Sequence, residues 1–314
     1  MYPPTVNSSC YGTINNNNTN GPHNTTILNN SEIEPLLHPS DQMPTGTRTP
    51  DLPGFPKVSL GTAPPSSRWR RHLTTDIDRS YADVILIICY LITGLLDSSS
   101  ISIWGSFVSM QTGNTVYAGL GLAAPNESAR LIKSVTSLAA FCLGSFLFSR
   151  FHRLWAPKRR WVLCVSFTAQ SAFTMAAAAV VTMTGKPHYS EDVEWHVLLP
   201  IALLAFQSGG QAVTSRVLRY NALTSVVLTS IYCDLFSDAD LFKLHNRERN
   251  QRVGAPVFLF LGALFGGFFA HTAFGVAGAL WMASGLKLVV VVLWLVWPAK
   301  PKPVVEYPDG LETA

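Results

Sequence analysis

The 314-residue chain is 48% hydrophobic, and only 13% of its residues are charged. An ordinary soluble domain carries about 25% charged residues, so this composition excludes that class and indicates a membrane protein whose main partner is the lipid bilayer. The formal net charge of +4 bears on orientation in the membrane and does not predict nucleic-acid binding.

Residues 1–78 are rich in Asn, Pro, Ser and Thr and include the low-complexity run Asn15–Asn18. Such a segment cannot bury enough apolar surface to offset the loss of chain entropy. We expect residues 1–78 to form a disordered cytosolic tail. Within it, Glu32, Leu36 and Leu37 resemble an acidic dileucine sorting signal, so one hypothesis is binding to a vesicle sorting adaptor. The other is that these residues occur together by chance.

Six apolar stretches are each long enough to cross a bilayer, which takes roughly 17–25 helical residues. They cover residues 83–103, 134–151, 161–183, 197–213, 253–271 and 274–297. The first follows four arginines, and positive flanks stay in the cytoplasm, so we expect a cytosolic N-terminus. The fold class is therefore an all-α membrane protein, with a membrane domain over residues 79–299 and a cytosolic C-terminal tail over 300–314.

Two shorter apolar segments, residues 110–124 and 221–236, carry polar residues at their start. If both turned back without crossing, the short loops on one side of the membrane would hold nearly all of the Lys and Arg. Only Arg130, Lys133 and Lys186 would lie outside. The positive-inside rule therefore favours six full spans plus two broken, re-entrant segments.

The two halves of the membrane domain, residues 80–184 and 195–298, share one order of parts: span, interrupted segment, span, span. LGSFLF at 143–148 takes the place of LGALFG at 261–266. Three crossings per half would insert the second half upside down. This predicts an inverted internal repeat. In many secondary transporters with such repeats, paired broken helices meet near the bilayer midplane, and we expect the two short segments to do the same here.

Two charged residues within spans are candidate site residues, because a charge in the bilayer is costly unless it is paired or hydrated. Asp97 is either a proton or cation site or a residue wetted at the end of its span. Lys287 lies near the middle of the last span and needs a partner, for which Asp97 or Asp234 is a candidate. We weigh a role in coupled transport against a fixed structural ion pair.

The polar residues of the two short segments are the other candidates, because neutral donors and acceptors beside broken helices coordinate ions or polar solutes. Helix-to-helix hydrogen bonding is the alternative, and it is the interpretation favoured for Gln170 and Gln207. The candidates are Thr112, Gly113, Asn114 and Thr115 in the first segment and Thr224, Thr229 and Asp234 in the second.

Residues 93–123 resemble the YoaK-like membrane proteins, which are catalogued as a domain of unknown function. Gly94 and Asp97 match a span ending near Gly-x-x-Asp, and the residues from Thr112 to Thr115 match a Met-Thr-Gly-Asn-Thr-like motif. Gln111 departs from that motif. The resemblance covers roughly residues 80–297 and implies a polytopic membrane protein with no assigned substrate.

These features predict a secondary transporter or permease for a small polar solute or ion, in the plasma membrane or an endosomal or vacuolar membrane. The alternative is a non-transporting scaffold or receptor-like protein whose polar residues only join helices. The sequence has no HExxH, GxSxG or GxGD motif and no CxxC pair. An enzyme, a metal site and a cofactor are therefore not expected.

Overall fold

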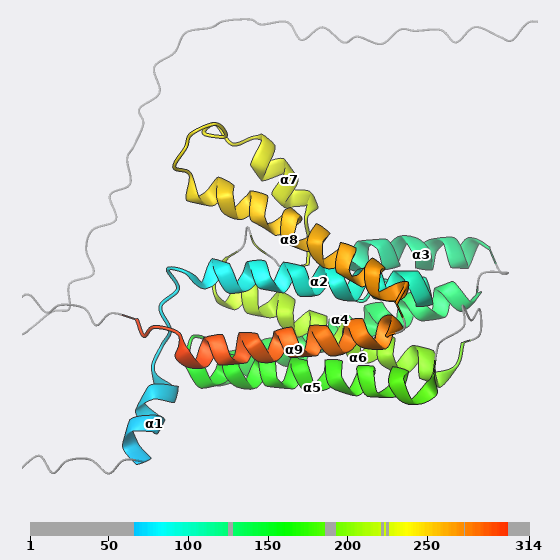
Figure 1. Cartoon of the computed structure of the whole chain (residues 1–314), viewed down its shortest axis with the longest axis horizontal. Helices are drawn as coiled ribbons and strands as arrows, with labels where there is room; N and C mark the ends of the chain where they lie inside the picture. The colour runs from blue at the N-terminus through cyan, green and yellow to red at the C-terminus, as the bar shows by residue number, and fades with distance from the viewer. Residues whose placement is uncertain are drawn as a thin grey trace, which may run out of the picture. The chain divides into compact units, whose positions relative to one another are not determined.

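The computed structural model describes residues 66–124, 128–185, 193–220, 223, 226–272 and 274–300. These residues form α-helices and no strands, as Figure 1 shows. The helices are α1 (Ser66–Thr74), α2 (Ala82–Trp104), α3 (Gln111–Ala123), α4 (Ser128–Leu154), α5 (Arg160–Thr184), α6 (Trp195–Val217), α7 (Thr229–Phe236), α8 (Arg247–Ala270) and α9 (Gly275–Val296).

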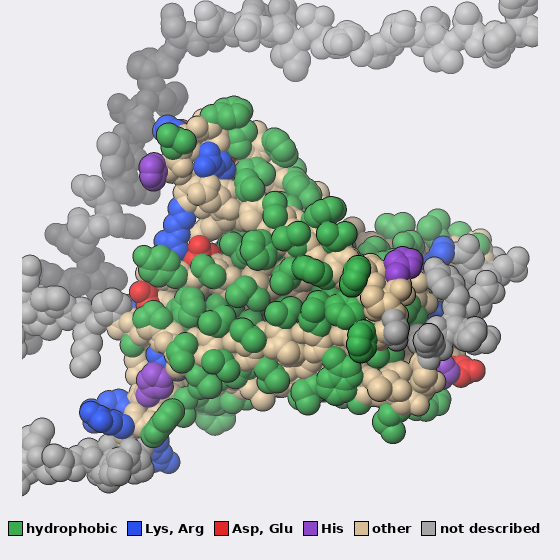
Figure 2. Space-filling model, in the orientation of Figure 1, with side chains coloured by type: hydrophobic (Ala, Val, Ile, Leu, Met, Phe, Trp, Pro, Cys, Tyr) green, Lys and Arg blue, Asp and Glu red, His purple; other side chains and the backbone are tan. Residues whose placement is uncertain are grey.

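Six of these helices, α2, α4, α5, α6, α8 and α9, are long and apolar enough to cross a membrane. Their outward faces carry many exposed large hydrophobic side chains, including Leu143, Phe260 and Val292. In Figure 2 hydrophobic side chains cover most of the visible face of the helix bundle, and most of the visible Lys and Arg lie at one end. This is the surface of a bundle surrounded by lipid, so the predicted membrane fold is confirmed.

One end of the bundle, here called the basic end, holds the N-termini of α2, α5 and α8 and the C-termini of α4, α6 and α9. Four contacts define it. Ile77 N donates to Lys158 O, Asp78 N to Pro298 O, Tyr220 Oη to Arg79 O, and Arg247 pairs with Asp83. Three helices therefore run in one direction and three in the other.

The short helices α3 and α7 do not cross the bundle. α3 joins the end of α2 to the start of α4, and both of these lie at the end opposite the basic end (Figure 1). α7 joins the end of α6 to the start of α8, and both of these lie at the basic end. The structure therefore has the six-span arrangement predicted from the Lys and Arg distribution, with one short helix on each side.

The most extensive helix contacts join the two halves of the chain, and not helices that follow each other in sequence. The closest helix pairs are α2 with α8, α4 with α6, and α5 with α9, and each pair joins a helix of the first half to one of the second. α2 and α8 run parallel, because Asp83 pairs with Arg247 while Gly94 meets Leu259 further along. In the order of parts, α6 of the second half corresponds to α2 of the first, and α4 of the first half corresponds to α8 of the second. The pair of α4 and α6 is therefore the counterpart of the pair of α2 and α8, as an inverted repeat requires.

Glycines allow the two parallel pairs to approach closely. A Cβ added at Gly94 of α2 would lie 2.0 Å from the carbonyl oxygen of Leu259, and one at Gly262 of α8 would lie 2.0 Å from that of Leu91. In the other pair, a Cβ at Gly144 of α4 would lie 2.1 Å from the carbonyl oxygen of Phe206. Such contacts replace the hydrophobic driving force that is missing between helices in lipid.

Residues 66–78 are ordered, although the sequence predicted disorder for them. Arg160 is buried and donates from its guanidinium to the carbonyl oxygens of His72 and Trp297. Ile77 is buried as well and forms an isolated bridge with Ala299. These contacts come from residues far along the chain, so local composition could not indicate them. The proposed sorting signal lies outside the described residues.

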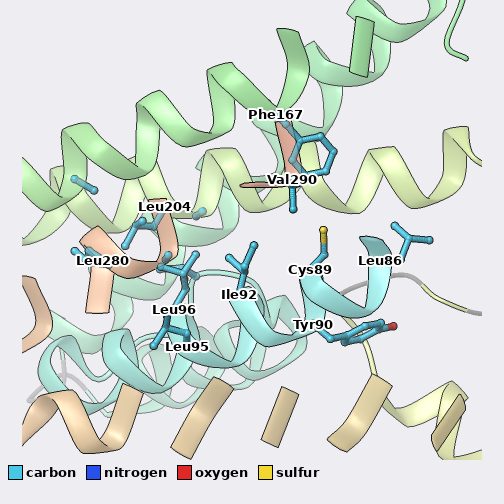
Figure 3. Packing of buried hydrophobic residues seen from close by; sticks show 14 of the residues in the cluster. Leu86, Cys89, Tyr90, Ile92, Leu95, Leu96, Phe167, Leu204, Leu280 and Val290 are labelled. Atoms are coloured by element: carbon cyan, nitrogen blue, oxygen red, sulfur yellow. The ribbon is translucent and has the colours of Figure 1, made fainter. Parts of the chain in front are cut away.

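The apolar core lies where α2, α5, α6 and α9 come together. In Figure 3 the Cys89 side chain points toward Phe167 and Val290, and Leu96 lies near Leu204 and Leu280. These side chains enclose a small group of polar residues, described below. A polar group that is surrounded in this way must find its partners inside the protein.

Candidate functional site

Asp97 holds the loop that connects α2 to α3. Its carboxylate Oδ1 accepts hydrogen bonds from the backbone N–H groups of Val108 and Ser109, both at 2.9 Å, and Oδ2 accepts one from the Ser109 hydroxyl. Asp97 is only 3% exposed, so the interpretation of a wetted residue at the span end is wrong. The loop begins at Gly105, whose φ of 69° favours glycine.

Asn114 holds the same loop from the other side. Its Oδ1 accepts from Phe107 N at 3.0 Å and from the Ser106 hydroxyl at 3.1 Å. Its Nδ2 donates to Phe107 O at 2.7 Å and to Ser137 Oγ of α4 at 3.0 Å. The structure thus brings Asp97 and Asn114 together around one loop, where their oxygen atoms already accept hydrogen bonds from the protein.

The other candidates in the first segment lie differently. Thr112 and Thr115 are exposed on α3, and the Thr115 hydroxyl donates to the carbonyl oxygen of Gln111 in its own helix. Gly113 faces the ring of Phe107, and a Cβ there would lie 2.8 Å from two ring carbons. α3 therefore packs against the loop and α4, while its two threonines face away from the bundle.

The second short segment does not join the first. α7 packs on α8 at the basic end, and α3 packs on α4 at the opposite end (Figure 1). Thr229 and Asp234 are exposed on α7, and Thr224 lies outside the described residues. The expectation that the two broken segments meet near the midplane is therefore wrong, because each connects helix ends on its own side.

Asp234 borders an open polar cavity of about 560 Å³ between α7 and α8, formed mostly by the loop around Asp238. The Asp238 carboxylate accepts from Asp240 N at 2.9 Å, Asn246 Nδ2 at 3.2 Å and Arg252 at 3.0 Å. The backbone N–H of Asp240 contributes most to lowering the pKa of Asp238, and Asn246 and Arg252 add to it.

The loop over residues 237–246 should therefore lose order only in acid. A carboxyl whose folded-state pKa is lowered stabilises the fold above its unfolded pKa of about 3.9, and this contribution is lost as the pH falls further. Amide hydrogen exchange of the loop, corrected for the intrinsic rate, should be constant from neutral pH to about pH 5 and rise below about pH 4. The Asp238→Asn variant should exchange fast throughout, and protection equal to wild type would contradict this role.

Lys287 lies at the centre of the bundle and is 0% exposed. Its Nζ donates to Gln170 Oε1 of α5 at 2.9 Å and to Gln211 Oε1 of α6 at 2.8 Å, and it lies 5.7 Å from the ring centroid of Phe167. None of the ion pairs among the described residues includes Lys287. The expected pairing with Asp97 or Asp234 is therefore replaced by two neutral amides.

Gln211 ties this centre to α2. Its Nε2 donates to the Thr93 hydroxyl at 2.8 Å and to Cys89 O at 3.1 Å. Lys287, Gln170, Gln211 and Thr93 form what we call the lysine centre. Thr93 and Gln170 belong to the first half of the chain, and Gln211 and Lys287 to the second. The lysine centre is therefore built across the interface between the halves.

The polar contacts continue from the lysine centre toward the basic end. Gln170 Nε2 donates to Ser166 Oγ at 3.4 Å, and Ser166 Oγ lies 3.3 Å from His152 Nε2, at the end of α4.

Gln207 lies one helical turn before Gln211, and its buried Oε1 accepts no hydrogen bond from the described residues. Among the described residues Gln207 donates only within α6, whereas Gln170 binds Lys287 of α9. The predicted interhelical role therefore holds for Gln170 and not for Gln207.

An ammonium at the bilayer centre costs about 2.5–3.5 kcal/mol on insertion scales, even before any protein contact is considered. Two amide oxygens hydrogen-bond the Lys287 ammonium without neutralising it. Residues of this kind are retained where they contribute to a pathway or a binding site. Among the described residues, no group of three His, Cys, Asp or Glu side chains could hold a metal ion.

Sequence reasoning missed three residues of this arrangement. Thr93, Gln211 and His152 were not among the candidates, although a polar residue inside an apolar span is a signal for Thr93 and Gln211. His152 stands beside a basic loop and gave no signal of its own. All three were identified only when the helix packing placed them on the chain of contacts around Lys287.

Six alternating spans, a short helix on each side and a buried polar centre between the halves define a multi-pass α-helical membrane protein. The chain belongs to the family described as "Protein of unknown function (DUF1275)", which matches residues 85–293. No curated protein and no solved structure matches the chain.

Proposed function

We propose that the protein is a secondary transporter or permease for a small polar solute or ion, with its site at the lysine centre. The observation that carries the proposal is Lys287, fully buried and hydrogen-bonded to neutral amides at the interface between the two halves. Secondary transporters place their substrate sites at the interface between repeats, near the midplane. The site therefore differs from the one expected at the broken helices.

Alternating access would come from a movement of one half against the other. The lysine centre draws on α2, α5, α6 and α9, so a shift between the halves changes the contacts of Lys287 with Gln170 and of Gln211 with Thr93. Lys287 and Gln211 both belong to the second half and stay together. Ser171 of α5 and Ser284 of α9 also meet at this interface, with their hydroxyl oxygens 3.1 Å apart. Hydroxyl contacts of this kind can be exchanged for water at modest cost.

Chemical labelling tests alternating access without knowledge of the substrate. Thr93 is 2% exposed, yet a Thr93→Cys variant without the native cysteines should react with a water-soluble thiol reagent in the membrane, because the site opens to water during the cycle. The matched Ala177→Cys variant, at an equally buried position of α5, should stay unlabelled. If Thr93→Cys resists the reagent as fully as Ala177→Cys does, a rigid scaffold is the better description.

The basic end supports a cytosolic location for both ends of the membrane domain. Arg79, Lys158, Arg159, Arg219 and Lys300 all belong to segments at this end. Positively charged loops are retained in the cytoplasm, which supports the proposal that the ends at residues 66 and 300 lie there. The hypothesis of a sorting adaptor that binds Glu32, Leu36 and Leu37 requires the same orientation, in the plasma membrane or an endosomal or vacuolar membrane.

A further inference from the structure

We propose that the lysine centre takes a small oxyanion. This inference rests on the proposed function, since it names the class of solute that the same site would carry. Three features of the structure support it: the charge of Lys287, the position of Gln207 and the route to the basic end.

Among the residues that the structure describes, none that contacts Lys287 offers it a negative charge. The helices packed around it contribute Cys89 and Thr93 from α2, Phe167 and Gln170 from α5, and Gln211 from α6. All of these are neutral donors, acceptors or apolar groups. A buried ammonium in such surroundings is compensated best by an anion that binds beside it, through a charge-assisted hydrogen bond.

Gln207 narrows the class of anion. Its Oε1 is a buried acceptor without a partner among the described residues, one helical turn from Gln211. Buried polar atoms without a partner are rare, and an unpaired atom of this kind indicates a group that is missing from the structure. An oxyanion that carries a hydroxyl group, such as dihydrogen phosphate or lactate, places an acceptor oxygen on Lys287 and donates to Gln207.

The polar contacts between the site and the basic end also favour an anion. The contacts from Lys287 through Gln170 and Ser166 end at His152, which is buried near the basic end and leaves its Nδ1 without a partner among the described residues. Beyond His152 the chain continues into the basic loop with Lys158 and Arg159. Positive charge around a polar route raises the local concentration of anions.

Uptake into vesicles tests the class of solute. Full-length protein is reconstituted in vesicles of phosphatidylcholine and phosphatidylglycerol and supplied with labelled formate, lactate, phosphate, glycerol or methylammonium. We expect at least one of the three anions to enter faster than in protein-free vesicles. Lys287→Gln should reduce this uptake by about tenfold or more, because a charge-assisted contact is lost. Lys243→Gln, an exposed change of the same type, should leave it unaltered.

A second variant keeps Lys287 and guards against a folding defect. Gln211→Glu places a carboxylate on the ammonium at nearly unchanged volume, so the internal ion pair should compete with the anion and reduce uptake by about tenfold or more. Asn250→Asp adds the same charge at an exposed position and should have no effect. Anion uptake by Gln211→Glu at the wild-type rate would overturn the inference.

The outcomes separate this inference from the proposed function. If Thr93→Cys is labelled while only glycerol or methylammonium enters, the protein is a transporter and the oxyanion class is wrong. If Thr93→Cys is not labelled and none of the five solutes enters, the proposed function fails together with the inference. Entry of an anion that depends on Lys287 supports both.

Discussion

Replacement of Gly94 by alanine should separate α2 from α8 and destabilise the protein by about 3 kcal/mol or more, at the upper end of the range for overpacked cores. The added Cβ would lie 2.0 Å from Leu259 O and 2.8 Å from Ala263 N. Both are backbone atoms of α8, which a change of side-chain rotamer cannot move. The two helices must therefore shift apart along the most extensive contact of the bundle.

Thermal unfolding in detergent measures this effect. Cys89 and Cys164 are buried, so a dye that reacts with thiols reports unfolding once the other three cysteines are replaced by serine. Gly285→Ala is the matched control, because nothing lies within 4 Å of the added Cβ and alanine favours a helix over glycine. Equal unfolding temperatures for Gly94→Ala and Gly285→Ala would contradict the close approach of α2 and α8.

Gly144→Ala extends the test to the pair of α4 and α6. The Cβ would lie 2.1 Å from Phe206 O, nearly the same clash as at Gly94. If the halves are related by inversion, the two variants should be destabilised to a similar degree. A loss confined to Gly94→Ala would show that the two pairs differ in importance.

Replacement of Asp97 by leucine should destabilise the protein by roughly 3–9 kcal/mol, since it leaves two buried backbone N–H groups and one hydroxyl unpaired at about 1–3 kcal/mol each. Asp97→Asn should cost about 1–2 kcal/mol, because its amide oxygen still accepts from Val108 and Ser109 while the Ser109 hydroxyl loses its acceptor. The expected order of stability is wild type, Asp97→Asn, Asp97→Leu.

The same unfolding assay decides the role of Asp97. Asp234→Asn is the control, since Asp234 is exposed on α7 and should tolerate the change. If Asp97→Leu unfolded at the wild-type temperature, the hydrogen bonds to the loop would not be what holds it. If it abolished solute uptake at unchanged stability, Asp97 would return as a candidate ion site.

The topology was predictable from charge and segment length. Arg79, the basic loop after the second apolar stretch and the basic loop before the fifth placed one side in the cytoplasm, and the two short apolar segments were too short to cross. The structure shows this order, with α3 and α7 each returning to the side from which it came. Order along the chain says nothing about which helices touch, so the pairing of α2 with α8 could not be foreseen.

The candidate site was predicted only in part. Lys287 and Asp97 were recognised because a charge within a span is rare. Their partners were not recognised. Asp97 accepts hydrogen bonds from the loop that follows α2, and Lys287 donates to helices that are distant in sequence. Hydrogen bonds of this kind depend on the rotation of each helix about its axis. These spans are apolar around most of their circumference, so their sequence pattern does not determine that rotation.

The pairing across the halves has a consequence for biogenesis. α9 leaves the ribosome after the other five spans described, and it carries Lys287, whose partners Gln170 and Gln211 lie on α5 and α6. When the Lys287 ammonium enters the membrane, the helices that carry both amides have therefore already been inserted. In contrast, α2 lacks its main packing partner until α8 has been synthesised. Nascent chains arrested before α8 should consequently expose the Gly94 surface to lipid and to quality-control proteases.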